Sequence, residues 1–565
     1  MRNRNIIAGI LLAILAVTLW RLTQPTLTDE LRFQQFTFEP GLAASPAISP
    51  DGRMVAYASD RDTGGLLQLY VQPVHGGNPV RLTDSSASIS SADFSPDGAT
   101  IAFTAGGGLY TIPVNGGVPH LLAAAGPPAR YSPDGRWIAA AHGAGVAIFS
   151  VASGVSNPFH PEFHEVSALA WSPDGASLIF WAGDDFHVAL REGGTVESTG
   201  IGTRLAKAGI GPGPFDDAVW TRYGLIFSAR TGSARNIYRC PLGPAGKATG
   251  SIVRLTNGTE LMGDASVSRE GRVVFSSGRQ RFDIWGIPLD ADSGKAKGAP
   301  YRITDTLAPT ANPDISADGK RLIFGSARNG YTEVWEKDLV TGRERVAATS
   351  PEGASYGRLL KSSSEILYVQ PMGVHDDVYL GKSKLAIGTR PWDADSKGTT
   401  VLVSGAGIDA LDVATKQRTP LIAAPAQTRL SDASFSPDDR WLVFVAVAKD
   451  TSGIYVVPAH GGKWLQITDS AIRAGKPRFS PDGRLIYFTL DRDGAREIAA
   501  VRFDPQSGVV SGEPFTVFRP AVAKLSLLSI NPAALNIAVA RSTLVTILCE
   551  QTSTIWVGDL VPIER

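Results

Sequence analysis

The stretch PRFSPDGRLIYFTLDRDGAREIAAVRF at residues 477–503 decides the fold of this chain. A short strand-like segment at 476–480 runs into Ser-Pro-Asp-Gly, an apolar run covers 485–489, and a further strand-like run follows a polar turn and covers 497–503. Proline presets the φ angle of such a turn, aspartate hydrogen-bonds within its own loop, and glycine takes the left-handed position. The stretch therefore predicts three antiparallel strands joined by tight turns.

The same turn recurs along the chain. Perfect Ser-Pro-Asp-Gly copies lie at 49–52, 95–98, 132–135, 172–175 and 480–483, and weaker copies lie at 221–224, 268–271, 316–319 and 436–439. Successive copies are about 40 residues apart, which is the period of four-stranded propeller blades. Segments such as 81–83 and 302–304 supply a fourth strand. Because a residue present in every unit cannot define one active site, we interpret the motif as architectural.

The apolar residue before each turn counts the units. These markers are Ile48, Phe94, Tyr131, Trp171, Trp220, Val267, Ile315, Leu359, Trp392, Phe435, Phe479 and Ile530. A ring usually holds four to eight blades, so we expect an all-β chain with two consecutive β-propellers of about six four-stranded blades each. A split of seven plus five stays open.

The predicted propellers cover residues 33–299 and 300–565. We expect segments 35–37 and 283–285 to close the first ring, and 302–304 and 555–557 to close the second. Closure of this kind removes exposed strand edges that would otherwise aggregate.

The first residues indicate export. We interpret residues 1–5 as a cytoplasmic tip, 6–22 as a signal anchor or signal peptide, and 23–32 as a linker. Positive charges precede the apolar run and no small-residue cleavage site follows it, which favours an uncleaved anchor. The propellers are therefore expected to be membrane-anchored and periplasmic or otherwise extracytoplasmic.

Composition and short motifs argue against several kinds of chemistry. The formal net charge is zero, so no positive field predicts nucleic-acid binding. Cys240 and Cys549 lie in apolar runs far apart in sequence and are expected to be buried free thiols. The eight histidines form no ligand set, and the acidic strings at 290–294 and 393–395 lack the carboxylate that ends a calcium loop. We therefore predict no metal and no cofactor.

Residues 353–357 fit the G-x-S-x-G pattern of a hydrolase nucleophile. That pattern needs a helix after the serine, whereas here a strand-like run follows at 365–369. We interpret Ser355 as the entry to a strand and assign no catalytic residue. Arginine recurs after the second strand of a unit, as in Arg279 and Arg328, and is expected to bond one blade to the next.

The repeat resembles a known family. An aromatic residue before Ser-Pro-Asp-Gly, then a strand such as Ile-Ala-Phe at 101–103, and later Ile-Tyr-Val at 454–456 resemble the WD-repeat-like propellers of TolB and related bacterial proteins. The resemblance covers roughly residues 33–565. It implies a protein that contacts envelope lipoproteins and peptides.

Ligands of propellers bind where loops surround the central channel. Polar residues three positions before a marker are our candidates for the channel mouths: Ser45, Ser91, Asp217 and Asp264 in the first ring, and Asn312, Asp432 and Lys476 in the second. Their alternative role is to satisfy backbone groups.

The sequence as a whole predicts a non-enzymatic interaction platform for an envelope protein or peptide. A propeller-type hydrolase or lyase, and the sensory half of a split regulator, remain alternatives.

Overall fold

The computed structural model describes residues 33–560 except 40, 64, 144, 164–165, 212–216, 233, 307, 373–374, 449–450, 470–472, 493–494, 521–523 and 528–534. Within these residues the regular structure is β-strand, apart from helix α2 (Ile201–Lys207) and a 3-10 turn at Pro244–Gly246. The expected all-β architecture is confirmed. The predicted anchor and the marker Ile530 lie outside the described residues. In the described part of the chain, no helix has the length and apolar character needed to cross a membrane.

The repeated turn has the predicted construction. In the copy at 49–52, the Ser49 hydroxyl donates to Asp51 Oδ1 at 2.5 Å and accepts the backbone N–H of Met54 at 2.9 Å. Six copies place glycine in the left-handed region with φ between 71° and 76°: Gly52, Gly98, Gly135, Gly175, Gly319 and Gly483. Each aspartate is thus engaged by its own turn, which confirms the architectural interpretation.

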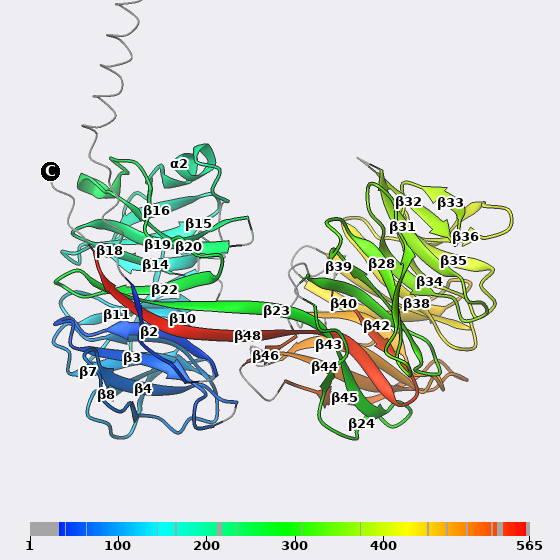
Figure 1. Cartoon of the computed structure of the whole chain (residues 1–565), viewed down its shortest axis with the longest axis horizontal. Helices are drawn as coiled ribbons and strands as arrows, with labels where there is room; N and C mark the ends of the chain where they lie inside the picture. The colour runs from blue at the N-terminus through cyan, green and yellow to red at the C-terminus, as the bar shows by residue number, and fades with distance from the viewer. Residues whose placement is uncertain are drawn as a thin grey trace, which may run out of the picture.

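The first body consists of antiparallel sheets whose strands follow chain order (Figure 1). Four of them are separate four-stranded sheets: β2 (Ala43–Ile48), β3 (Met54–Ser59), β4 (Gln68–Pro73) and β5 (Val80–Arg81); β6 (Ile89–Phe94), β7 (Thr100–Ala105), β8 (Gly108–Pro113) and β9 (His120–Ala124); β10 (Gly126–Tyr131), β11 (Trp137–His142), β12 (Gly145–Ser150) and β13 (Ser156–Phe159); β14 (Ser167–Trp171), β15 (Ser177–Ala182), β16 (Asp185–Leu190) and β17 (Glu197–Ser198). Next come β18 (Ala218–Thr221), β19 (Gly224–Thr231), β20 (Ala234–Cys240) and β21 (Val253–Arg254).

The second body repeats this arrangement with five four-stranded sheets. They are β26 (Thr310–Ile315), β27 (Arg321–Ser326), β28 (Glu333–Asp338) and β29 (Glu344–Ala348); β30 (Ser355–Leu359), β31 (Ile366–Met372), β32 (His375–Leu380) and β33 (Ser383–Ile387); β34 (Pro391–Ala394), β35 (Thr400–Ser404), β36 (Gly407–Asp412) and β37 (Arg418–Ala423); β38 (Thr428–Phe435), β39 (Trp441–Ala448), β40 (Thr451–Pro458) and β41 (Leu465–Gln466); β42 (Ala474–Phe479), β43 (Leu485–Arg492), β44 (Ala495–Phe503) and β45 (Val510–Phe518).

Two long strands join the bodies. Strands β23 (Arg272–Asp290) and β48 (Thr543–Asp559) pair antiparallel from Arg272↔Asp559 to Pro288↔Thr543, and Figure 1 shows them passing from one body into the other. In the first body the strand order is β22 (Leu261–Val267), β23, β48 and β1 (Gln34–Gln35). In the second body the order is β47 (Ile537–Val539), β48, β23 and β25 (Tyr301–Arg302). The paired strands β23 and β48 form a two-stranded ribbon. Short strands β24 (Lys295–Ala296) and β46 (Leu525–Ser526) flank this ribbon.

This pairing corrects the predicted closure. Segment 283–285 was expected in the first ring and 555–557 in the second, but Trp285 pairs with Arg302 of the second body and Val557 pairs with Gln34 of the first. The bodies therefore exchange their third strands. The expectation was wrong because β23 and β48 each continue through both bodies without a turn, whereas we assumed units local in sequence.

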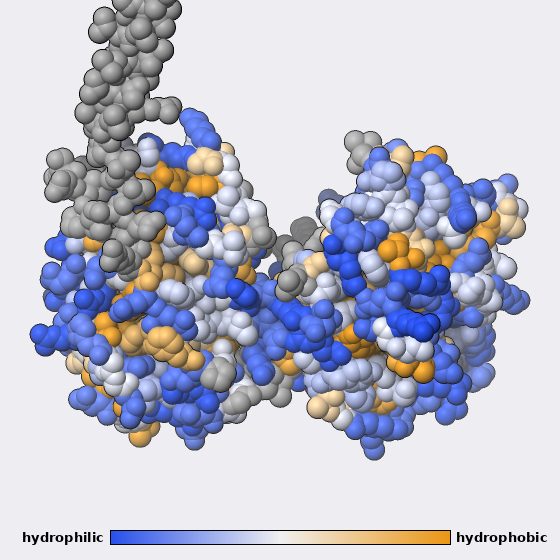
Figure 2. Space-filling view, viewed as in Figure 1, coloured by the Kyte–Doolittle hydropathy of each residue, from blue (hydrophilic) through white to orange (hydrophobic). Residues whose placement is uncertain are grey.

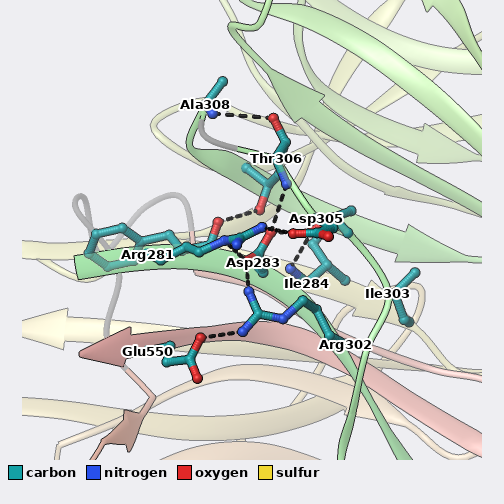
Figure 3. Close-up of polar contacts among 12 residues, drawn as sticks. Arg281, Asp283, Ile284, Arg302, Ile303, Asp305, Thr306, Ala308 and Glu550 are labelled. Atoms are coloured by element: carbon teal, nitrogen blue, oxygen red, sulfur yellow. Dashed lines mark hydrogen bonds and ion pairs between the residues drawn. The ribbon is translucent and has the colours of Figure 1, made fainter. Parts of the chain in front are cut away.

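An ionic cluster fixes the ribbon to the second body (Figure 3). The buried Asp283 carboxylate of β23 pairs with Arg281 at 2.6 Å and with Arg302 of β25 at 2.5 Å. Arg302 also pairs with Glu550 of β48, and Arg281 pairs with Asp305. The cluster thus connects three strands at the point where the ribbon enters the second body.

Two smaller predictions need correction. Strand β34 ends at Ala394, which pairs with Val401 as Phe94 pairs with Ile101, so the marker is Ala394 and not Trp392. Its turn begins with Asp395 in place of serine, which hid the register. The arginines after the second strand bond within their own sheets, since Arg328 pairs with Glu344 and Arg279 with Glu260.

The interior of both bodies is apolar, with core clusters between neighbouring sheets. Cys240 and Cys549 are buried free thiols, as predicted. On the face drawn in Figure 2, hydrophilic residues cover most of both bodies and hydrophobic residues form small separate patches.

Candidate functional site

Five innermost strands carry a bulge at the predicted candidate position. Register shifts interrupt the pairing of β2, β22, β26, β38 and β42 with their second strands. Five predicted residues have left-handed backbones there, with φ between 48° and 57°: Ser45, Asp264, Asn312, Asp432 and Lys476. A non-glycine residue in this region is strained, and such bulges re-aim side chains. The signal in the sequence was the polar residue three positions before each marker.

A cavity of about 490 Å³ opens at the turn side of the first body. It is lined by the ends of all six innermost strands and the turns that follow them. Its walls carry the prolines of the repeated turn (Pro50, Pro96, Pro133 and Pro173) and the aromatic residues Phe94, Tyr131, Trp171, Trp220 and Tyr223. Residues that build the repeat therefore also form an aromatic and proline-rich mouth.

A second cavity of about 310 Å³ lies at the opposite end of the same innermost strands. The predicted residues Ser45, Ser91 and Asp264 line it together. Both cavities share Pro46, Ala92 and Arg130. They are therefore the two ends of one axial channel, and Arg130 stands between them.

Three predicted residues of the first body bond neighbouring sheets. Asp264 Oδ2 accepts the backbone N–H of Ser45 at 3.3 Å, and Ser91 Oγ accepts that of Ala129 at 3.3 Å. The buried Asp217 accepts the N–H of Ala265 at 2.5 Å. These bonds give the residues a structural role, and their predicted role in binding a ligand stays a prediction.

A second series of polar residues, which sequence reasoning missed, lies immediately before the markers. Each side chain accepts the backbone N–H of the marker in the next sheet. The bonds join Asp93 to Tyr131 at 2.8 Å, Ser266 to Ile48 at 3.2 Å, Asp314 to Leu359 at 2.8 Å and Asp393 to Phe435 at 3.0 Å. The Ser266 bond joins the last innermost strand of the first body to the first. A polar residue between the bulge and the marker was the available signal.

Two carboxyl groups of the first body have raised pKa values, and one of them, Asp93, lines the larger cavity. Burial raises the pKa of Asp93 to about 6, against the favourable charge of Arg130. Burial and the neighbouring Asp264 carboxylate raise the pKa of Asp217 to about 6. The charge inside this channel therefore depends on pH.

The second body places paired charges at the same register. Lys476 Nζ lies 2.9 Å from Asp432 Oδ1, and Arg478 donates to Asn536 Oδ1 at 2.9 Å. Burial and the nearby Arg358 lower the pKa of Arg478. Although burial opposes it, Lys476 lowers the pKa of Asp432. Opposite charges compensate one another here, whereas the larger cavity of the first body is lined by three arginines and one acidic residue. The first channel is therefore the better candidate for a ligand site.

The serine of the G-x-S-x-G string begins strand β30, which confirms the interpretation of Ser355 as a strand entry. Across the residues that the structure describes, no three His, Cys, Asp or Glu side chains gather in a way that could hold a metal ion.

Repeated four-stranded antiparallel sheets whose innermost strands line an axial channel define a β-propeller protein. Residues 29–200 match the family profile of the TolB beta propeller domain. Over these residues the chain matches the TolB beta propeller domain, and the predicted resemblance is confirmed there.

Individual relatives match different shares of the chain. A segment of 62 residues, 11% of this chain, is 42% identical to the uncharacterized peptidase YuxL of Bacillus subtilis and spans 9% of that protein. A candidate TolB from Agrobacterium tumefaciens is 14% identical, with 50% of this chain and 99% of that chain covered and a TM-score of 0.36. The tricorn protease is 13% identical, with 84% of this chain and 52% of that chain covered and a TM-score of 0.32. Likenesses at these scores say nothing about function.

Proposed function

We propose that this chain is a non-enzymatic, exported and membrane-tethered β-propeller protein that acts as an interaction platform for a protein or peptide of the bacterial cell envelope. The observation that carries the proposal is the axial channel of the first body, with its aromatic and proline-rich mouth and Arg130 between its two ends. Flat apolar rings and prolines suit an extended peptide, since they offer contact area with little loss of side-chain freedom.

The proposal assigns six blades to each ring. The strand order supports this count, because each body has five sheets of consecutive strands and one sheet shared through β23 and β48. The apolar run at 6–22 after Arg2 and Arg4 supports export and tethering, and the TolB-type domain supports a periplasmic or other extracytoplasmic location.

A pull-down from envelope extract tests the proposal, with the full-length protein as bait. The rim variant Arg222→Glu/Arg269→Glu reverses two exposed charges that line the larger cavity. The matched control Arg53→Glu reverses a charge on a neighbouring turn, where the side chain is 81% exposed and lines no described cavity.

We expect an envelope partner that the wild type and Arg53→Glu retain and the rim variant loses. The same preparations are assayed on a panel of hydrolase and lyase substrates, and we expect no turnover. Turnover without a retained partner would instead support the alternative of a propeller-type hydrolase or lyase. Retention of a signalling protein alone would support the sensory half of a split regulator.

A further inference from the structure

Arg130 has unused hydrogen-bonding capacity in the first channel. Its Nη1 donates to the backbone oxygen of Ala129 at 3.0 Å and to Ser91 Oγ at 3.4 Å, both uncharged acceptors. Among the described residues no carboxylate oxygen lies within 4.0 Å of this guanidinium, and no partner is found for its Nε and Nη2. A guanidinium offers five donors in a planar fork that matches a carboxylate.

The nearest acidic side chains are already engaged. Asp93 accepts the N–H of Tyr131 at 2.8 Å, and Asp217 accepts those of Ala265 and Ser228 at 2.5 and 3.3 Å. Both carboxyls act on Arg130 through space and lie outside ion-pair distance. Their negative charge offsets part of the desolvation cost of the Arg130 guanidinium. They leave its Nε and Nη2 donors available to another group.

The wider mouth has the matching charge. Three arginines, Arg130, Arg222 and Arg269, line the larger cavity, whereas Asp93 is the single acidic residue in that lining. Arg222 and Arg269 are exposed at its rim, and Arg130 lies at its base, where the smaller cavity begins. The prolines occupy the same turn position as Arg222 and Arg269, and the aromatic residues Phe94, Tyr131, Trp171 and Trp220 precede these turns. Charge and shape together favour an anionic, extended ligand.

We infer that Arg130 is an anion-recognition residue and that it binds a carboxylate of an extended peptide which enters the first channel through the mouth on the turn side. The inference rests on the proposed function, because it names the chemistry of the ligand at the same site. The carboxylate comes from an acidic side chain or from the free end of the peptide.

Selection from a random library of displayed peptides tests the inference on the full-length protein. We expect the wild type to enrich peptides that carry Asp, Glu or a free terminal carboxylate beside aromatic residues or proline. Arg130→Met keeps an unbranched side chain and removes the guanidinium and its charge, and this variant should lose that enrichment.

Synthetic versions of the enriched peptide separate the two sources of the carboxylate. Fluorescence anisotropy compares the free acid with its carboxamide, and each Asp or Glu with Asn or Gln. Replacing the carboxylate that contacts Arg130 should weaken binding about ten- to hundredfold, as expected for one hydrogen-bonded charge pair. For Arg130→Met, replacing the peptide carboxylate should not change the affinity. Arg130→Lys should bind the peptide with intermediate affinity, because an ammonium group lacks the planar set of donors of a guanidinium.

The matched control is Arg358→Met. Arg358 occupies the same register in the second body, and its Nη1 likewise donates to the preceding backbone oxygen, at 2.8 Å. This variant should bind the peptide as the wild type does, and thermal unfolding of each variant shows that it is folded.

Three results would overturn the inference. Enriched peptides without any carboxylate, or equal affinities for acid and amide forms on folded Arg130→Met and wild type, would contradict the role of Arg130 and leave the platform proposal standing. A selection that enriches no peptide would contradict both.

Discussion

At the scale of single residues, the polar side chains of the innermost strands mainly hydrogen-bond backbone groups of neighbouring sheets, and so they stabilise the ring. The sequence placed Ser45, Ser91 and Asp264 around a common channel because the repeat has one register. A polar residue between the bulge and the marker was a signal for Asp93, but the roles of Asp93 and Arg130 depend on which backbone N–H and which cavity lie in the neighbouring sheet. Such contacts join residues about 40 positions apart, so the local sequence does not identify the partner.

Asp217 should make stability depend on pH. Its pKa is raised from 3.8 to about 6 in the folded state, so the unfolded chain loses this proton first as the pH rises. Asp217 therefore lowers the free energy of unfolding as the pH rises from 4 to 6, by about 3 kcal/mol at most. We predict that Asp217→Asn reduces the loss of urea resistance between pH 4 and pH 7.

Asp51 provides the control for this measurement. Its pKa is lowered, first by the hydrogen bond from Ser49, so its contribution has the opposite sign and is lost as the pH falls. In Asp51→Asn, the loss of urea resistance between pH 4 and pH 7 should be at least as large as in the wild type. An Asp217→Asn profile parallel to that of the wild type would contradict the assigned burial.

The stability of the protein should depend on the ion pairs of the buried Asp283 in β23. Arg302→Met removes one of two arginines paired with the buried Asp283 and leaves Glu550 of β48 without that ion pair. Loss of one partner of a buried pair costs about 3 to 5 kcal/mol. We predict a large drop in the urea midpoint of Arg302→Met. Arg53→Met removes a side chain that is 81% exposed and faces the exposed Asp51, so it should have a small effect.

At the scale of elements, strands and turns could be predicted well and their partners less well. The turn at 480–483, with its flanking strands β42 and β43, follows from proline, aspartate and glycine chemistry within a few residues. The exchange of β23 and β48 could not be predicted, because the strand pattern at 283–285 reads the same whichever body it joins. Only the pairing partners distinguish the two arrangements.

Removal of residues 552–565 should open the closing sheet of the first body. Residues 552–559 are the strand between β23 and β1, so their loss exposes the edges of both. We predict faster amide hydrogen exchange in β1, β22 and the first half of β23. Strands β34–β37 of the second body provide an internal control and should keep their protection. Unchanged exchange in β22 and β23 would contradict the pairing.

At the scale of the whole molecule, the two bodies depend on each other. A cut at 299/300 leaves β23 on one fragment and β48 on the other, although the two pair along their full length. We predict that fragments 33–299 and 300–565 aggregate when produced alone and form a one-to-one complex when produced together. Size-exclusion chromatography with light scattering checks this. Two stable monomers would contradict an obligatory exchange of strands.

Photo-crosslinking in a bacterial envelope tests the central claim, which is that the mouth of the first channel is where a partner binds. A photoreactive amino acid is placed at Pro133, exposed at that mouth, and in parallel at Pro437, in the corresponding turn of the second body. We predict a specific adduct with an envelope protein or peptide from position 133 and none from position 437. No adduct from position 133, or the same adduct from both positions, would contradict it.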